Sequence, residues 1–150
     1  EQLKVEIKAQ EERGEIAEEY VLNLELERLK KHPQLQEIKR TSLEDVKAGY
    51  DIQSFKSLES TSIDRFIEVK SFKERNERFF WSINEIKKSA ILKNGYILFI
   101  VNYSKINDKD YTCREISNPY EVFKMEQYIK EINDEKFKIE PQNFLISGII

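Results

Sequence analysis

Apolar residues recur at helical spacing in the first part of the chain. Between Glu11 and about Lys31 they form a broad stripe of positions three to four apart: Ile16, Ala17, Tyr20, Val21, Leu24, Leu26 and Leu29. The pair His32-Pro33 should end this segment, because a residue that precedes proline is disfavoured in the α region. The pattern therefore predicts one helix over residues 11–31.

Short runs rich in β-branched and aromatic residues follow, and turn residues separate them. They predict strands at residues 36–43, 50–55, 65–72, 96–103 and 111–116, with a further short extended piece at residues 79–81. The run at residues 96–103 is almost entirely apolar, which is typical of a strand covered on both faces.

Two more helices are predicted between and after these strands. Ser82 and Glu85 have the spacing of a capping box, which covers the exposed amide groups at a helix start, and this helix should reach about Lys93. The other should run over residues 118–132, and residues 137–146 should be extended or irregular. This order predicts the α/β class, with residues 1–150 forming one domain in which helices flank a mixed β-sheet.

Composition narrows the classes of function. Cys113 and His32 are the only residues of their kinds, so an intrachain disulfide and a site with several histidines are excluded. The four glycines form no glycine-rich phosphate loop. No apolar run approaches the roughly 20 residues that span a bilayer, so we expect a cytoplasmic protein without a membrane partner. The chain starts at Glu1 in a charged segment, and we expect it to be the C-terminal part of a longer protein.

The net charge of −3 conceals an uneven distribution of charge. Residues 39–109 carry 14 basic and 10 acidic side chains, whereas the segments on either side are acidic. A locally positive surface can attract a polyanion even when the whole molecule is acidic. The middle of the chain is therefore the best place to look for a site that acts on nucleic acid.

In that middle part, the predicted strand at residues 65–72 carries an acid and a base on one face. Side chains alternate along a strand, so Ile67 and Val69 point to one side while Glu68 and Lys70 point to the other. A surface pair on an ordinary strand would give the same pattern.

The preceding strand adds a second carboxylate. Asp51 follows the turn at Gly49, and Ile52 continues the apolar face. If the strands pair antiparallel with the isoleucines in register, Asp51 converges with Glu68 and Lys70 at one edge of the sheet. Two carboxylates can bind Mg²⁺, which acidifies a water molecule, and an ammonium can offset the charge of the transition state. This set suits hydrolysis of a phosphodiester.

An Asp on one strand followed by Glu-x-Lys on the next resembles the PD-(D/E)xK restriction-endonuclease-like superfamily. Further residues are similar to one branch, the domain at the C-terminus of the plant protein NO VEIN and of many bacterial proteins. They are Gly14-x-x-Ala17-Glu18-x-x-Val21-x-x-x-Glu25, Gly49-Tyr50-Asp51-Ile52, Ile67-Glu68-Val69-Lys70, and Asn84-Glu85 before Ala90 and the strand at residues 96–101. The resemblance covers about residues 11–102. The chain departs from it at Ala17, where glycine is expected, and at Ser71, where a small residue or glycine often occurs.

The resemblance implies a role for each matching residue. Asp51 and Glu68 would bind the metal together with the carbonyl of Val69, Lys70 would be the catalytic lysine, and Glu18 would be an acidic residue beside the metal. Mg²⁺ is the expected cofactor, and Mn²⁺ should substitute for it. Glu18 also fits a helix whose many glutamates face solvent.

Several polar residues near these positions are candidate contacts to DNA. Gln53 shares the face of Asp51, and five basic residues follow the site: Lys73, Arg75, Arg78, Lys87 and Lys88. A charge-rich loop is usually only solvated. The aromatic run Phe79-Phe80-Trp81 is more often part of a core than a platform for stacked bases.

Three functions stay open at this point. The first is a Mg²⁺-dependent endodeoxyribonuclease domain of a bacterial defence or DNA-processing protein, with DNA, other domains of the parent chain and a second copy as expected partners. The second is a non-catalytic module of the same fold that binds nucleic acid or a protein, and the third is a purely structural domain. The complete set of Asp51, Glu68 and Lys70 favours the first, because decayed sites usually lose one member.

Overall fold

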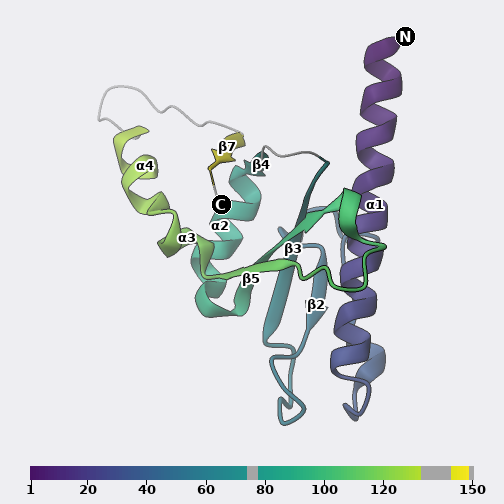
Figure 1. The fold of residues 1–150 in the computed structure, drawn as a ribbon. Helices are drawn as coiled ribbons and strands as arrows, with labels where there is room; N and C mark the ends of the chain where they lie inside the picture. Colours follow the sequence, from purple (N-terminus) through teal and green to yellow (C-terminus); the bar gives the residue numbers. More distant parts are fainter. Residues whose placement is uncertain (74–77, 133–142, 149–150) are drawn as a thin grey trace.

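A computed structural model describes residues 1–73, 78–132 and 143–148 of the chain (Figure 1). The described helices are α1 (Gln2–Arg28), α2 (Ile83–Leu92), α3 (Pro119–Val122) and α4 (Met125–Ile132), with short 3-10 helices at Leu35–Glu37, Lys93–Gly95 and Tyr103–Lys105. The strands are β1 (Lys39–Arg40), β2 (Ile52–Ser54), β3 (Arg65–Phe72), β4 (Arg78–Ser82), β5 (Tyr96–Asn102), β6 (Arg114–Ser117) and β7 (Asn143–Ser147).

Five of these strands form a mixed sheet in the order β1-β2-β3-β5-β6. β3 and β5 are parallel, and the chain passes between them through β4 and α2, whereas the other neighbours in the sheet are antiparallel. β4 pairs with β7 in a separate two-stranded sheet. The α/β class and the mixed sheet with flanking helices are confirmed.

Helices cover both faces of the sheet, with α1 on one side and α2, α3 and α4 on the other (Figure 1). On the α1 side, Ala17 and Val21 belong to a core cluster with Ile67 and Val69 of β3. On the other side, α2 and β4 form a second cluster with alternate residues of β5. β5 is therefore buried on both faces, as its apolar run predicts.

The first helix is longer than predicted. It starts at Gln2 instead of Glu11, because residues 2–10 are rich in Glu, Lys, Gln and Ala, which favour helix without any packing. This added part extends past the end of the sheet (Figure 1) and buries none of its residues. The helix ends at Arg28, shortly before the predicted stop at His32-Pro33.

The last third of the chain departs from the prediction in its details. The helix predicted over residues 118–132 is divided into α3 and α4, because Lys124 has a φ of 53°, in the left-handed region. Part of the extended segment predicted at residues 137–146 is β7, and residues 133–142 lie outside the described residues. In the described ranges, no helix is both long enough and apolar enough to cross a membrane.

Candidate active site

Asp51 is attached to β3 through both its main chain and its side chain. Its N–H donates to the carbonyl of Ile67 at 2.8 Å, and its Oδ2 accepts the N–H of Val69 at 2.8 Å. Ile52 lies opposite Ile67 in the antiparallel pair of β2 and β3. The register predicted from the apolar positions is therefore confirmed, and it places Asp51 beside the middle of β3.

The turn before Asp51 requires glycine. Gly49 has a φ of 82°, and a Cβ at this position would lie 2.8 Å from the Cβ of Lys88 in α2. The hydroxyl of Tyr96 donates to the carbonyl of Gly49 at 2.8 Å and fixes the turn against β5. A side chain at position 49 would be strained and would displace α2, so this glycine allows Asp51 and α2 to approach each other.

The two faces of β3 differ sharply in chemistry. Ile67 and Val69 point into the apolar core under α1. Glu68 is on the opposite face and is also buried, with only 5% of its surface exposed. A buried carboxylate requires a partner, because the loss of its hydration is costly.

The partner of Glu68 is Lys70, two residues along the same strand. The Nζ of Lys70 lies 2.9 Å from Oε1 of Glu68 and 2.9 Å from Oε2 of Glu85, the third residue of α2. Burial alone would lower the pKa of Lys70, but the two carboxylates outweigh it and hold this pKa above its usual value. Lys70 is therefore a protonated lysine shared between two glutamates.

Glu85 also caps the start of α2. The Oγ of Ser82 accepts the N–H of Glu85 at 3.2 Å, and Oε2 of Glu85 accepts the N–H of Ser82 at 2.9 Å. This reciprocal pair confirms the capping box predicted from the sequence. The contact with Lys70 was not predicted, and it ties the helix start to the site.

The carboxylates at this site outnumber the ammonium. Burial and the negative charge of Glu18 together raise the pKa of Asp51 to about 7, although the hydrogen bond from Val69 opposes the increase. Burial also raises the pKa of Glu68, and the charge of Asp51 adds to the effect. Asp51 and Glu68 thus depend on the single positive charge of Lys70, which also pairs with Glu85.

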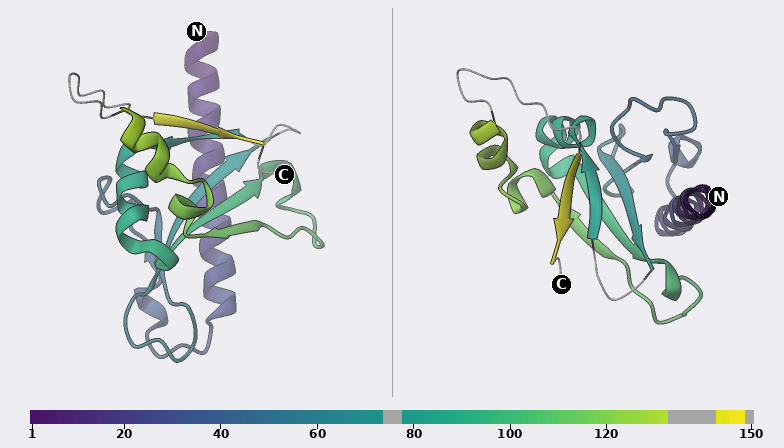
Figure 2. Two further views of the ribbon diagram at one scale, coloured as in Figure 1. Left: turned by 90° about the vertical axis from the view of Figure 1, so that its left-hand side faces the viewer. Right: turned by 90° about the horizontal axis from the view of Figure 1, so that it is seen from above.

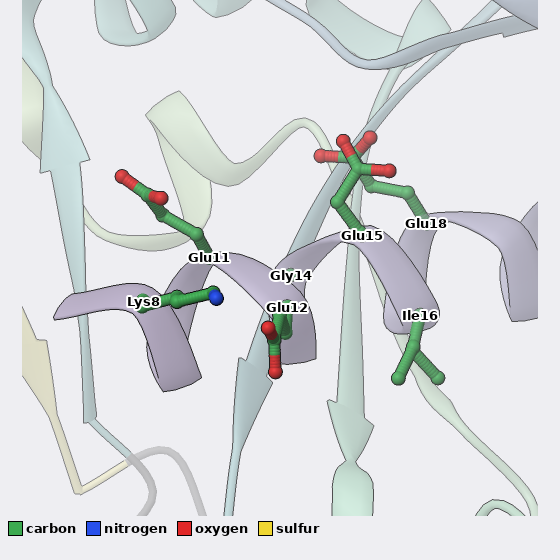
Figure 3. Close-up of a pocket in the computed structure, with 7 residues that line it drawn as sticks. All are labelled: Lys8, Glu11, Glu12, Gly14, Glu15, Ile16 and Glu18. Atoms are coloured by element: carbon green, nitrogen blue, oxygen red, sulfur yellow. The ribbon is translucent and has the colours of Figure 1, made fainter. Parts of the chain in front are cut away.

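Glu18 lies on the other side of Asp51 and is bound by Arg40 of β1. The Nε and Nη2 of Arg40 both donate to Oε2 of Glu18, which also accepts the hydroxyl of Ser42 at 3.3 Å. Arg40 bonds Glu15 as well, at 3.3 Å. Figure 3 shows Glu15 and Glu18 on one side of α1 with their carboxylates close together. The role of Glu18 beside a metal stays a prediction, and Arg40 was missed by the sequence analysis.

The model of one protein family, described as "Protein NO VEIN, C-terminal", matches residues 17–116, two thirds of the chain. The chain belongs to this family. The matched range runs from α1 to β6 and contains Asp51, Glu68 and Lys70. No curated protein and no solved structure shows a significant match.

Within the range matched to the NO VEIN family, Glu25 forms a separate buried cluster. Its carboxylate accepts hydrogen bonds from Arg28, from Arg65 and from the hydroxyl of Ser54. Burial alone would raise the pKa of Glu25, but Arg28 and Arg65 outweigh it and the pKa is lowered. Two guanidinium groups already satisfy this carboxylate, which therefore holds α1 against β2 and β3.

The candidate DNA contacts are in different places. Gln53 donates to the carbonyl of Glu37 at 2.8 Å, next to β1. Lys88 is half-buried against Gly49, and Lys87 is exposed on α2. Their contact with DNA stays a prediction.

Lys73 and Arg78 lie at the end of β3 and the start of β4. Both are exposed and line a cleft that also reaches Lys70. Arg75 lies outside the described residues. In the aromatic run, Phe79 and Trp81 are core residues, whereas Phe80 is 67% exposed.

Another cationic residue at this cleft precedes the range matched to the NO VEIN family. Arg13 of α1 lines the same cleft as Lys70 and Arg78. The sequence analysis gave Arg13 no role. The sequence feature that could have indicated Arg13 is its position four residues before Ala17, on the stripe of α1 that faces the sheet.

The oxygen ligands present suit a hard cation. Asp51 and Glu68 provide two carboxylates whose pKa values are raised, first by burial and then by neighbouring carboxylates. The N–H and C=O of a strand residue point to the same side, so the carbonyl of Val69 faces the side of β3 where Asp51 lies. No group of three or more His, Cys, Asp or Glu side chains gathers for a metal anywhere in the described part of the chain. The donor set is therefore two carboxylates and a carbonyl, which fits Mg²⁺ with water molecules in the other positions.

Proposed function

We propose that this domain hydrolyses phosphodiester bonds in DNA with Mg²⁺ or Mn²⁺ bound by Asp51, Glu68 and the carbonyl of Val69, as in a restriction-endonuclease-like nuclease. The observation that carries the proposal is that the half-buried Asp51, just before β2, lies beside the buried Glu68 and the ammonium of Lys70 on β3. Membership of the NO VEIN family is consistent with it, because the matched range contains all of these residues.

A bound divalent ion would supply the missing positive charge and would lower the pKa of a water molecule. The chain's own contribution is position and charge. Asp51 is held by two hydrogen bonds to β3, so its carboxylate does not need to reorganise when it takes part in binding. Glu68 is fixed on the same strand by burial and by Lys70.

Lys70 acts in this proposal as a donor and not as a base. Its raised pKa keeps it protonated near neutral pH, so it has no free electron pair to accept a proton. A protonated Nζ can hold the attacking water and offset the negative charge that develops on the phosphate. Glu85 orients Lys70 from α2 and is a positioning residue.

A cleavage assay tests the proposal. Supercoiled and linear DNA are incubated with metal-free protein, to which Mg²⁺ or Mn²⁺ is then added. Asp51→Asn, Glu68→Gln and Lys70→Ala should each reduce the rate at least about 100-fold, since each removes a group from the reacting centre. Asp110→Asn is the matched control. Asp110 is exposed on a loop before β6, so this variant should cut DNA like the parent.

Each result of this assay has a clear meaning. If Asp51→Asn and Lys70→Ala cut as fast as the parent protein, the activity comes from another site or a contaminant. If the parent protein never cuts DNA with either metal, the nuclease proposal is wrong.

A second function has an observation in its favour. Lys70 already bonds both Glu68 and Glu85, so the ammonium is used within the fold. A domain that binds DNA without cutting it would need no more than this stable network and a basic surface. Binding that weakens steeply with salt, with no cleavage under any metal, would support this function.

A further inference from the structure

A cleft of about 800 Å³ opens beside Lys70. Its walls come from four elements: α1, the end of β3, the start of β4, and β7. In Figure 2, β4 and β7 lie side by side near the edge of the sheet beyond which the N-terminal part of α1 extends. The residues that matter for its chemistry are Arg13, Lys70, Lys73, Arg78, Phe80 and Leu145.

The charged side chains among the described residues that line this cleft are all of one sign. Four of its described lining residues are cationic and none is acidic. Among the described residues, no carboxylate pairs with Arg13, Lys73 or Arg78, whereas Lys70 pairs with Glu68 and Glu85. Unpaired cations on facing walls attract a polyanion and lower the cost of bringing it close to the acidic site.

The N-terminal part of α1 explains how Arg13 reaches this place. Ala17 and Val21 pack on the sheet, and the same helical stripe continues backwards to Arg13 and Gln10, which both line the cleft. These two residues are polar where the stripe passes the end of the sheet. The same face of α1 therefore packs on the sheet at Ala17 and Val21 and lines the cleft at Gln10 and Arg13.

The opposite wall offers an aromatic ring next to a cation. Arg78 and Phe80 are two residues apart on the outer face of β4, whereas Phe79 and Trp81 on the inner face are buried. Phe80 is 67% exposed, and Leu145 beside it on β7 is 52% exposed. An exposed ring between cations is a platform on which an unpaired base can stack. A duplex cannot use it in this way, because its base faces are covered by neighbouring bases.

We propose that this cleft binds single-stranded DNA, and that single-stranded DNA, including unpaired ends or flaps, is the substrate of the site at Asp51 and Glu68. The substrate part of this inference rests on the proposed nuclease function, but the binding part does not. Arg13, Lys73 and Arg78 contact phosphates, Phe80 stacks on a base, and the strand passes the mouth of the cleft at Lys70.

A binding assay without metal tests the proposal. Fluorescence anisotropy is measured in EDTA with a labelled strand of about 20 nucleotides and with the duplex of the same sequence, a length that exceeds typical single-strand sites. The single strand should bind at least about tenfold more tightly than the duplex. Arg13→Ala and Arg78→Ala should each weaken binding and reduce the slope of log Kd against log salt by about 1.

Phe80→Ala separates stacking from charge. It should weaken binding of the single strand about 5- to 100-fold without changing the salt slope, because stacking contributes through the base and not through phosphate. Lys56→Ala, in the loop between β2 and β3, and Tyr128→Ala, exposed on α4, are matched controls outside the cleft and should bind like the parent. Circular dichroism confirms that every variant is folded.

The outcomes for the cleft and for the nuclease are distinguishable. Asp51→Asn should bind the single strand like the parent. If this variant binds but does not cut, the lost cleavage reports on the metal site and not on the cleft. A parent protein that binds the single strand but never cuts it supports the cleft and refutes the nuclease. Equal affinity for duplex and single strand, with no effect of Phe80→Ala, overturns the cleft proposal. Tighter binding of the matched RNA strand overturns the choice of DNA.

Discussion

Two glutamates of this protein are equally buried but have opposite surroundings. Glu25 is 1% exposed and Glu68 is 5% exposed. Arg28, Arg65 and Ser54 all donate to Glu25, and its pKa is lowered. Glu68 has one cation, Lys70, which it shares with another carboxylate, and its pKa is raised.

The difference lies in the balance of charge around the two carboxylates. At Glu25 two guanidinium groups, one of which also pairs with the exposed Glu115, balance the carboxylates, and nothing further is needed. At Glu68 the negative charges of Asp51 and Glu85 compete for one ammonium, so the folded protein carries an electrostatic cost that a divalent ion can relieve. Burial alone therefore does not set the direction in which the pKa of a carboxylate shifts, whereas the nearby charges do.

The largest expected effect comes from the same substitution at the two glutamates. Glu25→Gln leaves two arginines without their buried carboxylate and should lower the free energy of unfolding by about 3–5 kcal/mol near neutral pH. Glu68→Gln removes an excess negative charge and should leave the stability unchanged or slightly raised. Urea unfolding in EDTA measures both. Equal destabilisation by the two substitutions would show that the sites are energetically alike.

A smaller effect is expected at the ammonium. Lys70→Ala leaves Glu68 and Glu85 without a cation in a partly buried site and should cost about 2–3 kcal/mol in metal-free buffer. Mn²⁺ should restore part of this loss, because it replaces the missing charge. Lys87→Ala, exposed on α2, is the matched control and should change the stability by less than about 0.5 kcal/mol. A loss that Mn²⁺ leaves untouched would argue against a cation site.

The pH dependence sharpens the comparison further. The pKa of Asp51 rises from 3.8 to about 7 on folding, so the folded state binds more protons than the unfolded state between these values. Its contribution to stability is therefore present below about pH 4 and is lost as the pH rises through about 7. Glu25, with a lowered pKa, has the opposite sign and loses its contribution when the pH falls.

Asp51→Asn should remove the first of these dependences. The variant keeps an oxygen that can accept the N–H of Val69, and near pH 8 it should be more stable than the parent by about 1–3 kcal/mol. Thermal melts in EDTA from about pH 5 to about pH 8 measure this, and each kcal/mol corresponds to about 2–4 °C. If the melting temperatures of the two proteins change equally with pH, Asp51 is not the source of this pH dependence.

Local patterns in the sequence predict the centre of the candidate site. Alternation along β3 separates Glu68 and Lys70 from Ile67 and Val69, and matching the apolar faces sets Ile52 opposite Ile67. These two rules are enough to bring Asp51 to β3. The capping box of α2 is similarly local, since its two members are three residues apart.

The remaining contacts depend on how distant elements pack. Lys70 meets Glu85 only because α2 lies against the sheet, and Arg40 meets Glu18 across 22 residues. Arg13 is different, because it lies within the predicted helix and on its stripe, four residues before Ala17, and only its place at the cleft depends on how α1 packs beside β3 and β4. No rule of spacing contains such information, so these partners could not be predicted from the sequence.

Titration of Mn²⁺ into metal-free protein by isothermal calorimetry tests the central claim most directly. The parent and Glu25→Gln should each bind a single ion, whereas Asp51→Asn and Glu68→Gln should bind none at the same concentrations. Absence of binding to the parent, or equal binding to Asp51→Asn, would contradict the assignment of a divalent cation to these two carboxylates.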